Sequence, residues 1–454
     1  MDASYNVYMN SPSLPRIVIV GAPNVGKSSL FNCLTKTRQA LVVDQPGLTR
    51  DRLYGLGIVG VRPYIIVDTS GLNTGRKVGI NVLMELQTQR AISDADYILL
   101  LVDGRVGLTA PDKLLATKLR QLNKPITLVI NKGEGLDSVA LQNEFACLGF
   151  PAAFVISAAH RQGIELAINE ILAYFSSVEA SSTQNQDAQE NSEISRIKVA
   201  IIGKPNVGKS TLLNRILGEE RVLVFDQPGT TRDSTAHHFN YRDRLYTLID
   251  TAGIRRRSKT AEGVEKLSVI KSLEAIAASH VVLMLIDATE GVTDQDLHLL
   301  GVTREAGKAL IVAVNKWDGL SAEQRLQVKQ SLDRRLAFVN FAKIAFISAL
   351  YGTGVSNLFN AIQQAYRSAT RVLSTSHLTR LLAQAVNAHQ PPVRLGHMAK
   401  LRYAHPGGHN PPVILIHGQY TRYLPESYRR YLENFYRKNL CLVGSSIRIK
   451  FKDK

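Results

Sequence analysis

Gly21-Ala22-Pro23-Asn24-Val25-Gly26-Lys27-Ser28 is the stretch of sequence that decides the fold, and it returns as Gly203-Lys204-Pro205-Asn206-Val207-Gly208-Lys209-Ser210. Each octapeptide follows an apolar run and precedes a helix-like segment, the context in which G-x-x-x-x-G-K-S forms a phosphate-binding loop. Backbone N–H groups and the helix amino terminus surround the phosphates in such a loop, the lysine adds positive charge, and the serine reaches Mg²⁺. The sequence therefore predicts two nucleotide sites, each including the residue after the loop, Ser29 or Thr211.

The two loops belong to two copies of one longer segment. LVVDQPGLTRD at 41–51 and LVFDQPGTTRD at 223–233 differ at two positions, and both this pair and the loops are separated by 182 residues. Further along, the offset grows to 191 between Ser157 and Ser348, as short loop insertions in the second copy would produce. The repeat predicts two whole domains of the same fold.

Short apolar runs alternate with longer amphipathic stretches in each copy, which is typical of β-α units around a mostly parallel sheet. The expected strands are 16–20, 64–67, 97–102, 126–130 and 153–156 in the first copy, and 198–202, 246–249, 281–286, 310–314 and 344–347 in the second. Ligands of such sheets bind at the carboxyl ends of the strands. We therefore predict two P-loop NTPase domains of the α/β class.

Composition excludes several classes of protein. The chain has 454 residues, 45% hydrophobic and 20% charged, which fits two to four globular domains and excludes a disordered chain or a coiled-coil rod. No apolar run suggests a signal peptide or a membrane span. Three separated cysteines, Cys33, Cys147 and Cys441, without a Cys-x-x-Cys pair suggest neither disulfides nor a zinc site. We expect a cytoplasmic protein without an integral membrane partner.

A second motif at the strand ends predicts Mg²⁺ binding. Asp68-Thr69-Ser70-Gly71 and Asp250-Thr251-Ala252-Gly253 each follow an apolar strand. The aspartate of such a D-x-x-G segment holds the water shell of Mg²⁺, and the glycine N–H meets the γ-phosphate.

A third motif predicts the base. Asn131-Lys132-Gly133-Glu134 and Asn315-Lys316-Trp317-Asp318 follow the next buried strands and offer an amide and a carboxylate to a purine edge. A carboxylate accepts from N1–H and the 2-amino group of guanine, a donor pair that adenine lacks, so the pattern favours GTP over ATP. Ser157-Ala158 and Ser348-Ala349 complete the order of motifs, and we expect them near the base.

With these motifs in order, each copy resembles a translation-factor-type GTPase domain, and the tandem pair with a basic tail resembles the bacterial Der (EngA) family of tandem GTPases. The resemblance runs from about Arg16 to the end of the chain. It implies a GTP-hydrolysing switch that acts in assembly of the large ribosomal subunit, with ribosomal RNA and ribosomal proteins as partners, as a monomer. It also implies that Thr49 and Thr231 join Mg²⁺ only with GTP bound, beside Ser28, Asp68, Ser210 and Asp250.

Two features of the motifs bear on catalysis. Leu72 and Ile254 stand where Ras-like enzymes have the water-orienting glutamine, so another element must stabilise the transition state. In similar GTPases an asparagine at the position of Asn24 and Asn206 helps bind K⁺, and we expect these asparagines to act with Lys27 and Lys209. Their alternative role is to satisfy the backbone of the loop.

The two copies also differ at two places. Glu134 replaces the usual aspartate, and its extra methylene group weakens the expected guanine selectivity of the first site. The run Arg255-Arg256-Arg257 has no counterpart in the first copy, and it is either a solvated loop or a contact for an acidic neighbour.

The last region carries most of the positive charge. Residues 371–454 contain 14 Lys and Arg against three acidic residues, which is +11 of the net +17 of the chain, and this charge favours nucleic acid as a partner. The apolar runs 413–416 and 440–443 and the amphipathic stretches 377–388 and 427–436 predict a small α+β domain, similar to the KH-like domain of the family. Its adjacent glycines, Gly407 and Gly408, do not form the G-x-x-G loop by which KH domains clamp RNA.

Its aromatic residues and histidines have ordinary roles in our interpretation. Six tyrosines lie among the arginines, and we expect most of them to pack the core although some could stack on RNA bases: Tyr403, Tyr420, Tyr423, Tyr428, Tyr431 and Tyr436. We interpret His405, His409 and His417 as loop histidines, not metal ligands.

The expected organisation is an extension at 1–15, GTPase domains at 16–175 and 196–370, a flexible polar linker at 176–195 and the basic KH-like domain at 371–454. Two other functions stay open: a nucleotide-gated RNA-binding sensor with negligible turnover, and a GTPase partner of an RNA-modification enzyme. Turnover in K⁺ against Na⁺ distinguishes the sensor, and a co-purifying enzyme would identify the partner.

Overall fold

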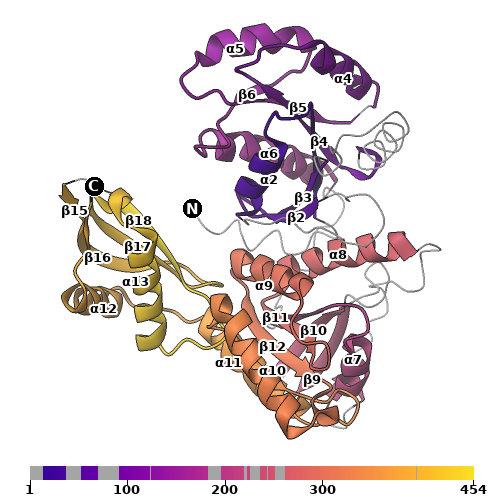
Figure 1. Cartoon of the computed structure of the whole chain (residues 1–454), viewed down its shortest axis with the longest axis vertical. Coiled ribbons are helices and arrows are strands. Elements are labelled where there is room, and N and C mark those ends of the chain that lie inside the picture. The colour runs from indigo at the N-terminus through magenta and orange to yellow at the C-terminus, as the bar shows by residue number, and fades with distance from the viewer. Residues whose placement is uncertain are drawn as a thin grey trace. The chain divides into compact units, whose positions relative to one another are not determined.

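The computed structural model describes residues 14–36, 53–69, 92–122, 124–182, 196–218, 222–224, 236–242, 244–250, 261–394 and 396–453. The chain forms two compact units, Met1–Ser192 and Glu193–Lys454 (Figure 1). The first unit holds the first copy of the repeat. The second unit holds the second copy together with the C-terminal region, so the three expected domains make two compact units.

The first copy is a sheet in the order β2-β3-β1-β4-β5-β6, parallel except for β2. Its strands are β1 (Arg16–Gly21), β2 (Leu53–Gly57), β3 (Tyr64–Asp68), β4 (Tyr97–Asp103), β5 (Ile126–Asn131) and β6 (Ala153–Val155). All five predicted strands are confirmed. The antiparallel edge strand β2 was not predicted, because Gly55 and Gly57 weaken a strand pattern. Packing requires them, since a Cβ at Gly57 would lie 2.3 Å from Cζ of the Tyr64 ring.

The second copy repeats this sheet with one more edge strand, in the order β13-β12-β11-β7-β10-β9-β8. Its strands are β7 (Ile197–Ile202), β8 (Val222–Val224), β9 (Ala236–Tyr241), β10 (Arg244–Asp250), β11 (Val281–Asp287), β12 (Ala309–Asn315) and β13 (Lys343–Phe346). The five predicted strands are again confirmed. The antiparallel strands β8 and β9 were missed, and β9 is rich in polar residues (AHHFNY).

Helices cover both faces of each sheet. In the first copy they are α2 (Lys27–Thr35), α4 (Ala110–Arg120), α5 (Ser138–Phe145) and α6 (Ile164–Ser182), and in the second α7 (Lys209–Leu217), α8 (Ala261–Ala278), α9 (Asp294–Ala306), α10 (Ala322–Arg335) and α11 (Val355–Ala369). Side chains of α2 and α6 pack with β1, β3 and β4 in one apolar cluster, and α7 and α11 pack likewise on β7, β10, β11 and β12.

Helix α6 corrects the expected linker. The helix continues to Ser182, so residues 176–182 are helical and not part of a flexible connection. Ala and Glu are good helix formers, and both occur in this extension. The rest of the expected linker, 183–195, lies outside the described residues.

The C-terminal region is a small α+β fold, as predicted. It consists of α12 (Thr375–Ala388), β14 (Val393–Arg394), β15 (His397–Met398), β16 (Lys400–Gly408), β17 (Val413–Gln419), α13 (Glu426–Asn439) and β18 (Arg448–Asp453). Strand β17 is central, antiparallel to β16 and parallel to β18, and α12 and α13 share its apolar cluster. Residues 440–443 form no strand; Leu440 and Leu442 are buried in the turn after α13.

Backbone hydrogen bonds fix this region to the second copy. Leu310 N–H at the start of β12 donates to Gly444 O (2.7 Å), and Gly444 N–H donates to Phe341 O (2.9 Å). The contact therefore lies at the amino-terminal ends of β12 and β13, opposite the strand ends that carry the motifs. No helix among the described residues is long and apolar enough to cross a bilayer.

Candidate functional site

Both phosphate-binding loops have the same backbone conformation. Asn24 and Gly26 have φ of 66° and 98°, and Asn206 and Gly208 have φ of 65° and 100°. A Cβ at Gly26 would lie 2.3 Å from Asn131 Nδ2, and a Cβ at Gly208 would lie equally close to Asn315 Nδ2. These positions require glycine because of both the left-handed backbone and the close approach of the asparagine.

The loop lysines are buried and directed at the loop. Lys27 Nζ donates to the carbonyls of Gly21 (2.9 Å) and Ala22 (2.8 Å). Lys209 Nζ makes the same bonds with Gly203 (2.8 Å) and Lys204 (2.6 Å). Burial lowers the pKa of Lys27, and the nearby charge of Asp68 opposes this shift.

The remaining loop residues divide between core and surface. Val25 and Val207 are buried under the loop, whereas Pro23, Asn24, Pro205 and Asn206 are exposed. Ser28, Ser29, Ser210 and Thr211 are exposed at the first turns of α2 and α7. Each loop therefore presents polar side chains and the helix N-terminus to solvent.

One pair of the expected Mg²⁺ residues is brought together. Ser28 Oγ donates to Asp68 Oδ2 at 2.9 Å, and Asp68 is fully buried at the end of β3. Thr69 Oγ1 donates to Ile19 O (2.9 Å), which ties β3 to β1. Nine other predicted residues lie outside the described residues, as does the side chain of Asp250, the last residue of β10: Thr49, Ser70, Gly71, Leu72, Thr231, Thr251, Ala252, Gly253 and Ile254.

The asparagine of the third motif joins two loops. Asn131 Nδ2 donates to Val25 O (2.8 Å), and Asn131 Oδ1 accepts from Ala158 N–H (2.9 Å). The second copy has the same bridge, with 2.7 Å from Asn315 Nδ2 to Val207 O and 2.9 Å from Ala349 N to Asn315 Oδ1. The expectation that the amide simply faces a purine is therefore incomplete, because both amide atoms brace the site.

The serines of the last motif shape their own loop. Ser157 and Ser348 are buried, and their hydroxyl oxygens accept from the N–H groups of His160 (3.2 Å) and Tyr351 (3.3 Å). They position Ala158 and Ala349, whose N–H groups meet the bridging asparagines.

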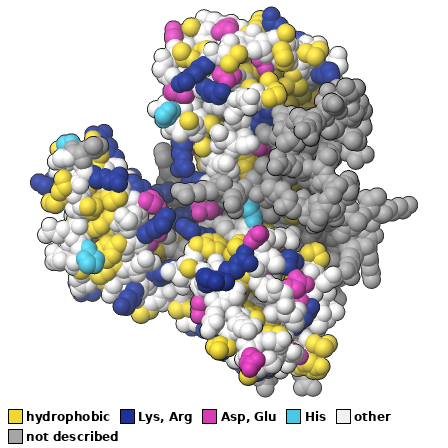
Figure 2. Space-filling view, in the orientation of Figure 1, with side chains coloured by type: hydrophobic (Ala, Val, Ile, Leu, Met, Phe, Trp, Pro, Cys, Tyr) yellow, Lys and Arg dark blue, Asp and Glu magenta, His cyan; other side chains and the backbone are white. Residues whose placement is uncertain are grey.

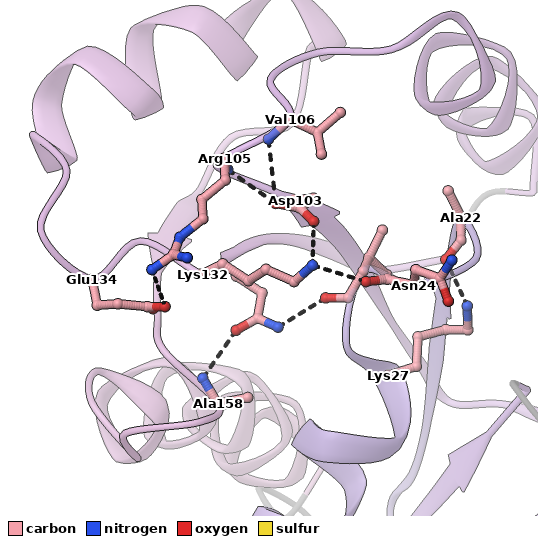
Figure 3. A network of polar contacts seen from close by, with 11 residues as sticks. Ala22, Asn24, Lys27, Asp103, Arg105, Val106, Lys132, Glu134 and Ala158 are labelled. Carbon is pink, nitrogen blue, oxygen red and sulfur yellow. Dashed lines mark hydrogen bonds and ion pairs between the residues drawn. The ribbon is translucent and has the colours of Figure 1, made fainter.

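Figure 3 shows a further network in the first copy, built around Asp103 at the end of β4. Lys132 Nζ donates to Asp103 Oδ2 (2.5 Å) and to Asn24 O (3.0 Å), which links the third motif to the phosphate loop. Burial opposes ionisation of Asp103, but the bonds from Lys132 and from backbone N–H groups hold its pKa below the usual value. In the second copy Lys316 Nζ lies 2.5 Å from Asp287 Oδ2.

Comparison with known proteins agrees with this geometry. The family described as "50S ribosome-binding GTPase" matches residues 16–132 and 198–316, and the "KH-domain-like of EngA bacterial GTPase enzymes, C-terminal" matches residues 372–452. GTPase Der of Vibrio cholerae serotype O1 is 50% identical over 97% of this chain and 93% of its own length. GTPase Der of Thioalkalivibrio sulfidiphilus is 53% identical with the same coverage. The chain belongs to the Der family of tandem GTPases.

As a Der GTPase, the protein binds GTP and GDP and hydrolyses GTP. The fold class predicted from the sequence, two P-loop GTPase domains and a KH-like domain, is confirmed. The two nucleotide sites of this chain are not identical. Their side chains differ at the third motif.

In the first Der site the unusual Glu134 has an ion-pair partner. Arg105 Nη2 donates to Glu134 Oε1 at 2.8 Å (Figure 3). A hydrogen bond from Ser157 and the charge of Arg105 lower the pKa of Glu134, so its carboxylate is ionised at neutral pH. In the second site Asp318 is exposed in a short 3-10 turn, Trp317–Gly319. The position equivalent to Arg105, two residues after the aspartate that ends the strand, is occupied by Thr289.

Three functional residues were missed by sequence reasoning: Asp103, Asp287 and Arg105. A signal for the aspartates was present, since both end long apolar strands, YILLLVD and VVLMLID, at equivalent places in the repeat. No pattern in the sequence points to the contact between Arg105 and Glu134, because 29 residues separate them.

Proposed function

We propose that this Der GTPase is a switch that hydrolyses GTP at both sites, binds the large ribosomal subunit and acts in its assembly in the cytoplasm. The observation that carries the proposal is the matching architecture of the two sites, with the same loop backbone, lysine contacts and asparagine bridge. Ribosome binding is supported by the name of the matched family and by the basic C-terminal region.

In this proposal the phosphates occupy the loops 21–28 and 203–210. Lys27 and Lys209 turn from loop carbonyls to phosphate oxygens, and the N–H groups at the starts of α2 and α7 donate to them. The carboxylates of Glu134 and Asp318 accept from the guanine edge, and Asn131 and Asn315 keep the phosphate loop and the Ala158 or Ala349 loop at a fixed separation.

The residues of the first site fit Mg²⁺, because the oxygens of Ser28 and Asp68 are adjacent hard ligands. We assign Ser28, Asp68 and Thr49 to this ion in the first site, and Ser210, Asp250 and Thr231 in the second. Bound Mg²⁺ would neutralise phosphate charge, as in other P-loop GTPases. We assign K⁺ to the exposed Asn24 and Asn206, where its charge would replace an arginine finger.

GTP turnover in KCl and in NaCl tests the catalytic part of the proposal, for the intact protein and for Lys27→Ala and Lys209→Ala. K⁺-dependent turnover that falls with either substitution supports two working sites. Negligible turnover in both salts, even with large subunits added, would replace the switch by the RNA-binding sensor.

Co-sedimentation tests the ribosomal part. Large subunits should pellet the protein with a non-hydrolysable GTP analogue more than with GDP, because the γ-phosphate orders the surface that docks. Equal pelleting with both nucleotides would contradict a switch, and no pelleting would contradict the ribosomal role.

A further inference from the structure

The sheet of the C-terminal region has two different faces. Along β17, Ile414 and Ile416 are fully buried under α12 and α13, whereas Val413, Leu415 and His417 alternate with them and are half-buried. Because side chains alternate across a strand, the second set faces away from the helices. This second set and its neighbours on β16 and β18 form what we call the open face.

Aromatic rings gather on the open face. Tyr403 on β16 lies opposite His417 on β17, and their rings are stacked with centroids 4.5 Å apart and planes 7° apart. His405 adds a third near-parallel ring, 5.1 Å from that of His417. Tyr403 is 38% exposed, so one of the rings is available to another flat group.

A hydrogen bond fixes these rings. His405 Nδ1 lies 3.0 Å from Pro406 O, which only accepts, so Nδ1 carries the hydrogen. Nε2 of His405 makes a 3.0 Å contact with Nε2 of His417. These two histidines are therefore ordered residues of strands, which corrects their interpretation as loop histidines, and no cluster of three or more metal-ligating residues occurs in the described part of the chain.

Lysines border the rings on the third strand. Lys450 pairs with Leu415 and Lys452 with His417 across the parallel β17–β18 ladder, so both point to the open face, and both are exposed. The acidic residues of the region lie elsewhere. Glu426 and Glu433 belong to α13, and Asp453 pairs with Gly418 and accepts from Thr421 N–H (2.7 Å). The open face is therefore aromatic and positively charged.

We infer that unpaired RNA binds across the open face, with a base stacked on Tyr403 and phosphates paired with Lys450 and Lys452. Rings on a sheet that stack bases, bordered by cations, form a recurring surface for single-stranded RNA. An acidic protein segment would complement the lysines but not the stacked rings. Basic and hydrophobic side chains both occur on the surface of the C-terminal region, as the one view in Figure 2 shows without distinguishing the open face.

The inference deepens the proposed ribosomal function and rests on it for the source of the RNA. It places the RNA on the sheet, and not on a glycine loop, since Gly407 and Gly408 lie within β16. The core accounts for three of the six tyrosines, fewer than the majority expected. Tyr428 and Tyr436 are buried, their hydroxyl groups donate to the carbonyls of His389 and Leu378, and Tyr431 packs against the same cluster.

Fluorescence anisotropy of the full chain with a short labelled single-stranded RNA tests the inference. Tyr403→Ala should weaken binding about 5- to 150-fold, the usual effect of removing one stacking ring, and Tyr403→Phe should restore it. Replacing both Lys450 and Lys452 by Ala should also make the log–log salt dependence less steep by about 1.4, for two phosphate contacts.

The matched control is Arg430→Ala with Lys438→Ala, which removes the same charge from exposed positions of α13 on the helical side. An equal loss of affinity in this control, or wild-type affinity in Tyr403→Ala, would overturn the inference. Loss with the lysine variant alone would show that charge holds the RNA without stacking on Tyr403, and it would overturn the inference too.

Pelleting with large ribosomal subunits separates this result from the proposed function. If wild type pellets with subunits and Tyr403→Ala binds RNA normally, the open face is wrong and the ribosomal role stands. If single-stranded RNA binds through Tyr403 but subunits do not pellet the protein, the open face stands and the ribosomal role fails.

Discussion

The guanidinium of Arg105 lies 2.8 Å from the carboxylate of Glu134 in the third motif of the first copy. The contact joins the loop after β4 to the third motif, and it holds one oxygen of the carboxylate that we assign to guanine. The second site has neither residue, since Thr289 and Asp318 stand at the equivalent places. We interpret Arg105 as a positioning residue for the longer side chain of Glu134.

Arg105→Thr should therefore weaken GDP binding at the first site about 2- to 5-fold, because an exposed ion pair contributes up to about 1 kcal/mol. The titration uses a Lys209→Ala background, so that the first site dominates the signal. Arg120→Thr, on the exposed side of α4, is the control. Once Glu134→Gln has removed the charge, adding Arg105→Thr should change little, and an undiminished effect would contradict the positioning role.

Removal of a bridging asparagine should lower both the stability of the domain and its affinity for GDP. Asn131→Ala leaves Val25 O and Ala158 N–H without their partner, and each unpaired buried group costs roughly 1–3 kcal/mol. The first unit should melt earlier and its GDP affinity should fall together with its stability, as measured by thermal denaturation with and without GDP. Asn360→Ala, at an exposed position of α11, should change neither quantity.

The sequence predicts features that depend on local patterns better than contacts between residues far apart in the chain. Strands in parallel pairs are largely apolar runs, so all ten were found, whereas β2 and β9 were missed because packing glycines and polar residues interrupt their patterns. Motif spacing located the asparagines and lysines of the sites. It could not show that Asn131 braces two loops or that Arg105 reaches Glu134, because these contacts arise only when separate strand ends meet.

Two half-buried histidines, His280 and His298, make the second unit sensitive to acid. Burial lowers the pKa of His298 to about 4, and burial with the charges of Lys308 and Lys198 does the same for His280. Below its ordinary pKa of 6.5 each histidine is protonated in the unfolded chain but stays neutral in the folded unit, so unfolding takes up protons. Stability should therefore fall as the pH falls from 6.5 to 4, by up to about 3 kcal/mol for each histidine.

His298→Leu should reduce this loss of stability, because leucine takes up no proton. The first copy has a leucine, Leu114, at the equivalent position, so the fold accepts this side chain. Urea denaturation of the full chain between pH 7 and pH 4 measures the effect, with His377→Leu in the first turn of α12 as control. A slope that is the same for His298→Leu and wild type would show that His298 is not the source of the sensitivity.

The contact between Asp103 and Lys132 should control how long GDP stays bound at the first site. Asp103→Asn keeps the size of the side chain but removes the charge that faces Lys132, whose Nζ also donates to Asn24 O. Without the carboxylate, Lys132 has a weaker anchor, and the phosphate loop and the third motif are held less firmly together. We expect GDP to dissociate about 10-fold faster from the first site, because a charged hydrogen bond contributes about 1.5 kcal/mol.

Asp287→Asn should do the same at the second site and leave the first unchanged, so stopped-flow dissociation of labelled GDP from each variant identifies the site. If Asp103→Asn altered the second site instead, or neither site, the network around Asp103 would not control nucleotide retention.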